Sequence, residues 1–324
     1  MGVFKEVSEA ESFMITKHLA KPFLKWAGGK TQLIEQLEAY YPKALKTGHI
    51  KNYYEPFLGG GAVFFHIINH YPVENFYLSD INEDLILVYQ VIQKAINPLL
   101  DLLDTYQKNY LNLEQEQRKA YFYQIREQYN QTRFKQNSLE ISKPWISRAA
   151  QLIFLNKTCF NGLFRNNQKG AFNVPFGAYK NPKILDETNL INVSQVLKKV
   201  FLNVADFREL EKQKMSKDSF IYLDPPYRPI SPTSNFTTYS KSRFDEAAQI
   251  RLANTFKGLN RQGVKLMLSN SDPKNIDKND HFFETQYDGF HIQRISANRM
   301  INSVGSQRGK ITELLITNYY SNPK

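Results

Sequence analysis

The chain has 324 residues, of which 42% are hydrophobic, and its 42 Lys and Arg against 31 Asp and Glu give a formal charge of +11. This composition is typical of a folded globular protein, as one large domain or two of ordinary size, and the positive charge favours a polyanionic partner. The single cysteine, Cys159, excludes a disulfide framework and a cysteine-based zinc site. Its apolar setting predicts a small buried hydrophobe rather than a nucleophile.

The N-terminal residues 1–21 mix charges with single apolar residues, which predicts a flexible tail and no signal peptide. No apolar run is long enough to span a bilayer. We therefore expect a cytoplasmic protein with no membrane partner.

The segment KPFLKWAGGK, residues 21–30, places a tryptophan, two glycines and a lysine before a helical pattern at 31–41. YYEPFLGGGAVFF, residues 53–65, then predicts a strand, a glycine loop and a helix, as in the first βα unit of a nucleotide-binding sheet. The glycine spacing differs from G-x-G-x-x-G and no Walker lysine follows. We therefore expect a cofactor without a pyrophosphate.

A second strand is predicted in NFYLSDINED, residues 75–84, with Asp80 at its carboxyl end. Asp80 follows Gly59 by 80 − 59 = 21 residues, the offset at which dinucleotide folds place an acidic residue against ribose hydroxyls. The alternative is a helix N-cap, which Asn82 would serve equally well. We favour the ribose role for Asp80.

The alternation of strands and helices stops over residues 96–190. Helical patterns at 98–137 and 144–157 lead into a loop at 157–182, in which lysines and an arginine stand among phenylalanines. Cations for phosphates and rings for bases suit nucleic acid. The alternative is a solvated basic loop with aromatic side chains tucked under it.

Beyond residue 190 the sheet pattern resumes, with strands at 200–204, 220–223 and 264–269 and a final hairpin of 290–295 with 311–318. Asp224 follows the second of these strands, and two prolines and Tyr227 come next. A carboxylate, exposed proline carbonyls and a flat ring suit a planar group that carries an amine. The alternative is a strand end with a Pro-Pro turn. Between the strands of the hairpin, Arg299 and Arg308 are candidates for phosphate contacts.

Four segments in fixed order, FLKWAGGK, EPFLGGGAVFF, LSDIN and LDPPY, with NGLFRNNQKGAFNVPFGAYKNPK before the last, resemble the Dam-type, D12-class DNA adenine-N6 methyltransferases with α-order motifs. The resemblance runs from about residue 22 to residue 319, and the closing RGKITELLITNY is most similar to GATC-specific enzymes of restriction–modification systems. It implies a Rossmann-like, mostly parallel α/β methyltransferase sheet with a largely helical target-recognition insertion. After the predicted tail at 1–21, it implies a catalytic domain at 22–95 and 191–324, with a DNA-binding domain at 96–190.

The resemblance implies S-adenosylmethionine as cofactor, with S-adenosylhomocysteine as product and double-stranded DNA as partner, and it suggests a cognate restriction endonuclease as a genetic partner. The implied catalytic residues are Asp224, Pro225, Pro226 and Tyr227. The implied cofactor-binding residues are Trp26, Lys30, Phe57, Gly59, Gly61, Asp80, Asp206, Phe207 and Asp224. The DNA-binding set comprises Lys25, Phe160, Asn161, Leu163, Arg165, Pro175 and, from the hairpin loop, Arg299 and Arg308. No metal is implied.

The sequence therefore predicts a site-specific enzyme that methylates N6 of a flipped-out adenine, with GATC as the expected site from the resemblance. Alternatives are an inactive DNA-binding module of the same fold, an enzyme acting on adenine in RNA, and one acting on a glutamine amide. The basic, aromatic insertion disfavours glutamine, and the glycine spacing disfavours a dehydrogenase.

Overall fold

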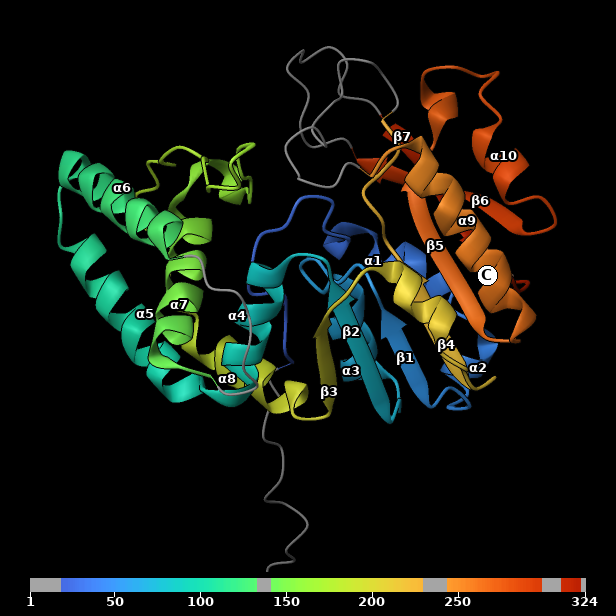
Figure 1. The fold of residues 1–324 in the computed structure, drawn as a ribbon, viewed down its shortest axis with the longest axis horizontal. Coiled ribbons are helices and arrows are strands. Elements are labelled where there is room, and N and C mark those ends of the chain that lie inside the picture. The colour runs from blue at the N-terminus through green and yellow to red at the C-terminus, as the bar shows by residue number, and fades with distance from the viewer. Residues whose placement is uncertain (1–18, 133–140, 230–243, 299–309, 322–324) are drawn as a thin grey trace, which may run out of the picture.

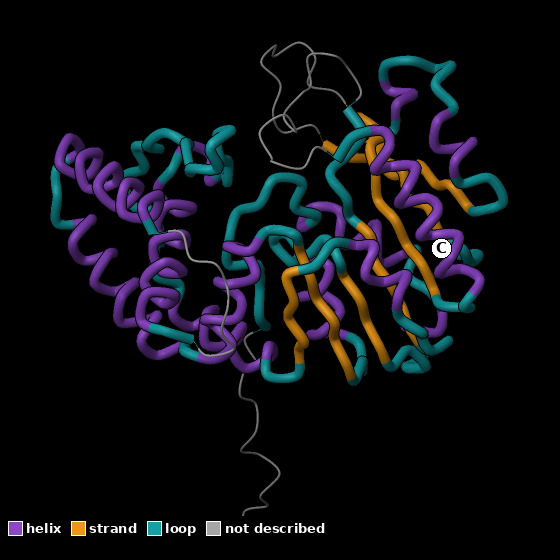
Figure 2. Tube along the Cα trace, in the orientation of Figure 1, coloured by secondary structure: helices purple, strands orange, loops and turns teal. Residues whose placement is uncertain are grey.

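The computed structural model describes residues 19–132, 141–229, 244–298 and 310–321. A seven-stranded sheet with strand order β3-β2-β1-β4-β5-β7-β6 lies at its centre (Figures 1 and 2). The first five strands in that order are parallel, whereas β7 runs antiparallel to both of its neighbours. The strands are β1 (Asn52–Glu55), β2 (Asn75–Asp80), β3 (Val200–Val204), β4 (Ser219–Leu223), β5 (Lys265–Ser271), β6 (His291–Asn298) and β7 (Lys310–Thr317). The predicted Rossmann-like, mostly parallel sheet and its closing hairpin are confirmed.

Strand β4 is buried along its whole length. Phe220 and Tyr222 join the hydrophobic cluster on one face of the sheet, and Ile221 and Leu223 join the cluster on the other. Because side chains alternate across a strand, a strand covered on both faces reads as a continuous apolar run. The apolar run at 220–223 therefore correctly predicted a strand that is buried on both faces.

Helices cover both faces of the sheet. Those that follow β1 and β2 contribute to the larger cluster, and α9 packs with β4 and β5 in the other. The α-helices are α1 (Ile34–Ala39), α2 (Lys43–Lys46), α3 (Ala62–His70), α4 (Glu83–Lys94), α5 (Ile96–Leu111), α6 (Gln115–Gln131), α7 (Lys143–Thr158), α8 (Glu187–Leu197), α9 (Glu246–Arg261) and α10 (Phe282–Gln286). The short 3-10 helices are η2 (Thr31–Leu33), η3 (Phe160–Gly162), η4 (Phe207–Lys212) and η6 (Pro273–Asn275). Over the described ranges no single helix is long and apolar enough to cross a membrane, and only α4 and α5 taken together, across a bend of 113°, meet the criteria of length and composition.

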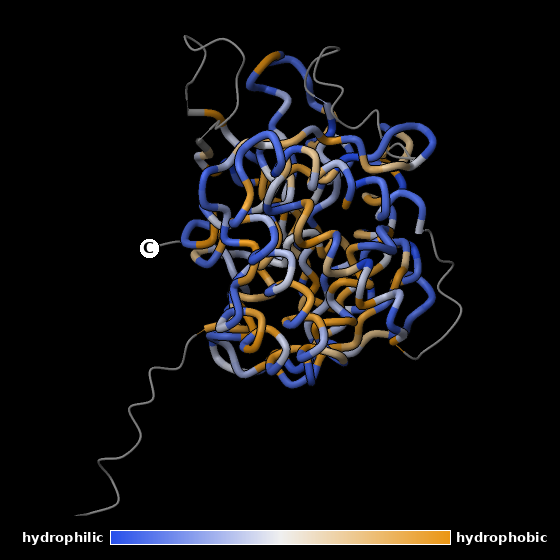
Figure 3. The backbone as a smooth tube through the Cα atoms, turned by 90° about the vertical axis from the view of Figure 1, so that its left-hand side faces the viewer, coloured by the Kyte–Doolittle hydropathy of each residue, from blue (hydrophilic) through white to orange (hydrophobic). Residues whose placement is uncertain are grey.

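The helices α5, α6 and α7 stand to one side of the sheet (Figure 1). An ion pair anchors α7: Arg148 donates from Nε to Oδ1 of Asp84 (2.6 Å) and from Nη2 to Oδ2 (2.9 Å). Tyr129 of α6 donates its hydroxyl to the same carboxylate (2.8 Å). Since Asp84 lies in the first turn of α4, these bonds tie α6 and α7 to the central sheet next to the end of β2. Viewed from this side, hydrophobic segments run through the interior and hydrophilic ones form most of the outer loops (Figure 3).

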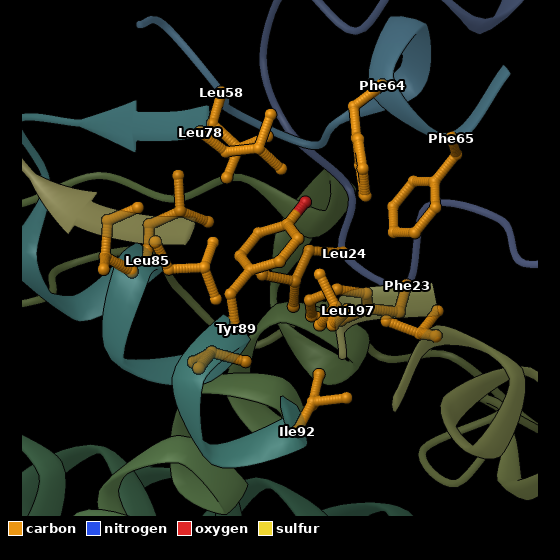
Figure 4. Close-up of a cluster of buried hydrophobic side chains, with 14 of the residues drawn as sticks. Phe23, Leu24, Leu58, Phe64, Phe65, Leu78, Leu85, Tyr89, Ile92 and Leu197 are labelled. Carbon is orange, nitrogen blue, oxygen red and sulfur yellow. The ribbon is translucent and has the colours of Figure 1, made fainter. Parts of the chain in front are cut away.

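The hydrophobic cluster beneath the glycine loop is built around Tyr89 of α4 (Figure 4). Its ring meets that of Phe23 edge-on, with 4.9 Å between the centroids. The Tyr89 hydroxyl donates weakly to the carbonyl of Gly59 (3.4 Å). A Cβ on Gly61 would lie 2.7 Å from the hydroxyl oxygen of Tyr89. The core therefore supports the loop from below and leaves no room for a side chain at residue 61.

Candidate active site

The sheet reverses its strand order between β1 and β4. From β1 the chain adds β2 and β3 on one side, and then β4 on the other. A reversal of this kind opens a crevice at the carboxyl ends of the strands, where ligands bind in α/β folds. Three carboxyl side chains stand at those ends: Glu55 closes β1, Asp80 closes β2 and Asp224 follows β4.

Lys30 binds the Asp224 side chain, with 2.9 Å between Nζ and Oδ1. The same ammonium donates to the carbonyl of Gly28 (2.6 Å) and lies 4.6 Å from the centre of the Tyr227 ring. Lys30 is 4% exposed, so its charge is removed from water and held by these partners. The structure thus brings a residue predicted for the cofactor together with the predicted catalytic segment.

Burial raises the pKa of Asp224 to about 6, and Glu313 adds to the shift while the Lys30 ammonium opposes it. The carboxylate is therefore mostly ionised at neutral pH, yet it is a much better proton acceptor than an ordinary aspartate. Burial also raises the pKa of Tyr227 well above its usual range. Its neutral hydroxyl donates to Oε2 of Glu313 on β7 (2.7 Å), which fixes the plane of the ring.

The two proline carbonyls that follow Asp224 differ. The expectation that both are available is wrong for Pro226, because its carbonyl accepts a hydrogen bond from Nε2 of Gln249 on α9 (3.0 Å). Within the part of the chain that the structure describes, no group donates to the carbonyl of Pro225. Of the two proline carbonyls, that of Pro225 is therefore the candidate acceptor beside Asp224.

A chain of hydrogen bonds from Gln249, Asn270 and Ser271, which we call the polar relay, holds the backbone of residues 226–228. Gln249 is 1% exposed and accepts a hydrogen bond from Nδ2 of Asn270 on β5 (3.1 Å). Asn270 in turn accepts from the backbone N–H of Arg228 (3.1 Å), and the Ser271 hydroxyl donates to the Arg228 carbonyl (2.7 Å). Two of these bonds hold the backbone of Arg228, and Gln249 links Asn270 to the Pro226 carbonyl, so the segment is fixed by residues of β5 and α9 and not by its own sequence.

The glycine loop lies against Trp26 and Asp80. Gly59 and Gly61 have φ values of 49° and 69°, a region that favours glycine. A Cβ on Gly59 would come within 2.9 Å of Cδ1 of Trp26. The Gly59 N–H donates to Oδ2 of Asp80 (3.0 Å), so Trp26 and Asp80, two of the predicted cofactor residues, both contact the loop.

Asp80 does not cap α4. Asn82 is the N-cap, because its side chain accepts from the backbone N–H of Leu85 (3.1 Å). Oδ1 of Asp80 accepts instead from the N–H of Asn82 (2.9 Å), and this bond helps to orient the carboxylate at the strand end. Burial raises the pKa of Asp80, although these backbone donors oppose the shift. The N-cap alternative for Asp80 is thereby excluded.

Asp206 and Phe207, the predicted cofactor residues that follow β3, make different contacts. Phe207 is buried and stacks on Phe57, with 5.5 Å between ring centroids, and Phe244 closes an aromatic triad with them. Asp206 caps η4 and binds Nε of Arg208 (2.8 Å). Partial burial works against ionisation of Asp206, but the hydrogen bonds from Arg208 lower its pKa below the usual value.

Residues 159–178 form a hairpin-like loop at the upper end of α7, beside α6 (Figure 1). Bridges between Cys159 and Phe176 and between Asn166 and Phe172 close it, and we call it the 159–178 hairpin. Cys159 is fully buried and its pKa is raised to about 12 by burial, which confirms it as a buried hydrophobe.

Several predicted DNA contacts lie on the 159–178 hairpin. Phe160 is 52% exposed, and its neighbour Asn161 has a φ of 56°, a strained value for a residue that is not glycine. Arg165 is held by Asn173, with 2.8 Å between Nε and Oδ1. Lys25 lies beside the hairpin with Nζ 5.2 Å from the Tyr179 ring centre. Leu163 is partly exposed and Pro175 is exposed, whereas Arg299 and Arg308 lie outside the described residues.

The sequence interpretation missed several residues of this site. Glu55 was within reach, because it ends its strand just as Asp80 does. Glu313 was also detectable, as the one acidic residue in the strand ITELLIT. Gln249 and Asn270 carried no sequence signal, because only the fold brings them to the proline segment.

Comparison with known proteins agrees with the geometry. A family model described as D12 class N6 adenine-specific DNA methyltransferase matches residues 26–301. The chain is 49% identical over 300 residues to the type II methyltransferase M.MjaIII of Methanocaldococcus jannaschii. The aligned region covers 92% of this chain and 99% of the relative. It is 36% identical to the type II methyltransferase M1.LlaDCHI of Lactococcus lactis (92% and 95%), and 30% identical to the DNA adenine methylase of Escherichia coli (91% and 94%).

Proposed function

Because the chain belongs to the D12 class of N6 adenine-specific DNA methyltransferases, we propose that it transfers a methyl group from S-adenosylmethionine to N6 of an adenine in double-stranded DNA. One observation carries the proposal: the Asp224 carboxylate and the Pro225 carbonyl, to which no group in the described ranges donates, stand together at the switch point of the sheet. Two acceptors match the two hydrogens of an exocyclic amine.

The residues around the glycine loop fit the proposed donor. A side chain at Gly59 or Gly61 would strike Trp26 or Tyr89, so glycine keeps the loop packed closely on both residues. Gly59 is partly exposed, and its backbone can be approached closely by a ligand. The Asp80 carboxylate suits ribose hydroxyls. Ile81, next to it, is 55% exposed and suits the face of an adenine ring. When bound, S-adenosylmethionine supplies an electrophilic methyl group on a sulfonium centre.

The chain's own groups orient the acceptor. The target adenine must leave the duplex, at a cost of a few kcal/mol, and stacking on Tyr227 returns about 1–3 kcal/mol. Asp224 and the Pro225 carbonyl hold the N6 hydrogens, and this aims the nitrogen lone pair out of the ring plane. With a pKa of about 6, Asp224 can accept the proton that N6 releases. Catalysis in this scheme is positioning and electrostatics, with no covalent enzyme intermediate.

We assign residues 96–190 to target recognition, residues 22–95 and 191–324 to the catalytic domain, and 1–21 to a tail. In this assignment Arg165 reads a guanine, Leu163 and Pro175 contact a thymine methyl group, and Lys25 reaches an outer guanine. Phe160 and Asn161 stand beside the extruded base, a role that the exposure of Phe160 supports. We propose GATC as the site, a cytoplasmic location, and a cognate restriction endonuclease in the same system.

The test is methyl transfer from labelled S-adenosylmethionine to duplexes that contain GATC or one of its single-base variants, with RNA of the same sequence alongside. We expect N6-methyladenine, identified after digestion to nucleosides, in the GATC duplex only. Label in another duplex would replace the GATC assignment, and label in RNA would favour the RNA alternative. No label in any nucleic acid would support an inactive DNA-binding module.

A further inference from the structure

Trp26 touches both halves of the proposed machinery. On one side it lies against the glycine loop, where a Cβ on Gly59 or Gly60 would be 2.9 Å or 3.3 Å from its atoms. On the other, its ring stacks on Phe164 of the 159–178 hairpin, with 5.2 Å between centroids and 17° between planes. One side chain therefore separates the backbone proposed to hold the donor from the loop proposed to read DNA.

Asn156 joins the same two segments through the backbone. It lies in the last turn of α7 and is 2% exposed, and its side chain accepts from the N–H of Lys25 and donates to the Lys25 carbonyl, both at 2.9 Å. Its Nδ2 also donates to the carbonyl of Gly162 in the hairpin (2.9 Å). A Cβ on Gly162 would overlap the Lys25 side chain, so the two strands of chain are in close contact. Phe164 and Asn156 thus hold residues 25 and 26 to the hairpin at two consecutive positions.

We propose that Phe164 and Asn156 are positioning residues that couple the donor site to DNA recognition. The coupling rests on the proposed function of the two sites. A duplex that presses on the 159–178 hairpin displaces Phe164, and the rigid connection passes this displacement to Trp26 and so to the glycine loop. By linkage, a donor that orders the glycine loop must favour the DNA-bound hairpin by the same factor.

A purely structural role predicts something different. Phe164 also packs on Phe172, with 5.9 Å between the ring centroids, so its loss would lower the stability of the hairpin in either case. Only coupling predicts that, once Phe164 is replaced, the affinity for one ligand no longer depends on whether the other is bound. Binding constants therefore separate the two roles, whereas a melting temperature does not.

The experiment measures the Kd of S-adenosylhomocysteine by calorimetry with and without a GATC duplex, and the Kd of the duplex with and without S-adenosylhomocysteine. In the unmodified protein we expect each ligand to tighten the other by at least about fivefold, with equal factors in the two directions. Phe164→Leu and Phe164→Met, which keep apolar volume without the ring, should bring both factors close to one. Phe164→Tyr keeps the ring and should retain the coupling.

Phe176→Leu is the matched control, because Phe176 belongs to the same hairpin but packs on Phe122 of α6. It should leave the factors at their original size. The proposal is overturned if both Phe164→Leu and Phe164→Met keep the original factors, or if the unmodified protein binds each ligand independently of the other. If the unmodified protein methylates adenine but the Phe164 variants keep the original factors, the coupling is refuted and the proposed function stands. Failure to bind S-adenosylhomocysteine would remove the proposed function as well.

Discussion

Lys30 and Asp224 form an ion pair with 2.9 Å between Nζ and Oδ1, although the lysine side chain is only 5% exposed. The ammonium also lies over the Tyr227 ring. Lys30 therefore lies next to Asp224 and Tyr227, two of the groups that are proposed to hold the adenine. Burial raises the pKa of Asp224, and the nearby ammonium of Lys30 makes that rise smaller. Removing the carboxylate should consequently affect chemistry far more than DNA binding.

We expect Asp224→Ala to lower methyl incorporation by at least about 100-fold, because a preorganised electrostatic partner of the reacting nitrogen is lost. Duplex binding should stay largely intact, since Asp224 lies at the strand end and away from the 159–178 hairpin. Asp288→Ala, at an exposed aspartate, is the control and should retain activity. In the unmodified enzyme, kcat should fall as the pH drops through about 6, where Asp224 takes up a proton. A rate that is level from pH 7 down to pH 5 would contradict this role.

The relay behind the prolines gives a second prediction. Gln249→Met removes the donor to the Pro226 carbonyl and the acceptor of Asn270 without much change in volume. We expect kcat to fall by up to about 100-fold, because a small misplacement of a reacting group is costly. The Kd values of donor and duplex should change little. Gln195→Met, at an exposed glutamine of α8, should match the unmodified enzyme. A rise in KM with no change in kcat would show that the relay serves binding and not positioning.

The sequence predicted the features that have a period or a local rule. Strand β4 could be recognised because both of its faces are buried, and the glycine loop because residues 59 and 61 require positive φ. The final hairpin followed from two apolar runs, at 290–295 and 311–318, which pair in the structure as β6 and β7. In each case the cause lies within a few residues of the effect.

The remaining parts of the site depend on contacts between distant segments. Which proline carbonyl is available is decided by Gln249, 249 − 226 = 23 residues further along the chain. The partner of Asp206 and the stack between Trp26 and Phe164 likewise require the folded arrangement.

Arg165 provides a test of sequence reading. Arg165→Ala should cost about 1–3 kcal/mol of discrimination at one base pair of the site, because a bidentate contact to a guanine edge is lost. Overall duplex affinity should fall less than specificity. Lys169→Ala, at an exposed lysine of the same hairpin, should instead weaken binding to all sequences alike and reduce the salt slope by about one. Methylation rates on a set of single-base variants, and binding at several salt concentrations, distinguish the two patterns. Unchanged discrimination by Arg165→Ala would remove this residue from base recognition.

Glu55 gives the stability of the protein a specific dependence on pH. It is 2% exposed, and burial raises its pKa from 4.5 to about 8 although it accepts a hydrogen bond from the Tyr53 hydroxyl (2.6 Å). Between those two pKa values the folded state holds a proton that the unfolded state has released. The contribution of Glu55 to stability is therefore complete below pH 4.5 and is lost as the pH rises, by up to about 1.4 kcal/mol per pH unit, until it levels off above about 8.

Glu55→Gln keeps the shape of the side chain and cannot ionise, so its free energy of unfolding should lack this component. We expect the difference between the variant and the unmodified protein, measured by urea unfolding, to grow in favour of the variant as the pH rises from about 5 to about 8. Glu74→Gln is the control, because Glu74 is exposed and pairs with Lys51 at the surface. Its curve should run parallel to that of the unmodified protein. If the Glu55→Gln curve were parallel as well, the buried carboxyl between Asp80 and Asp224 would be ionised in the folded state, and the electrostatics proposed for the site would have to be revised.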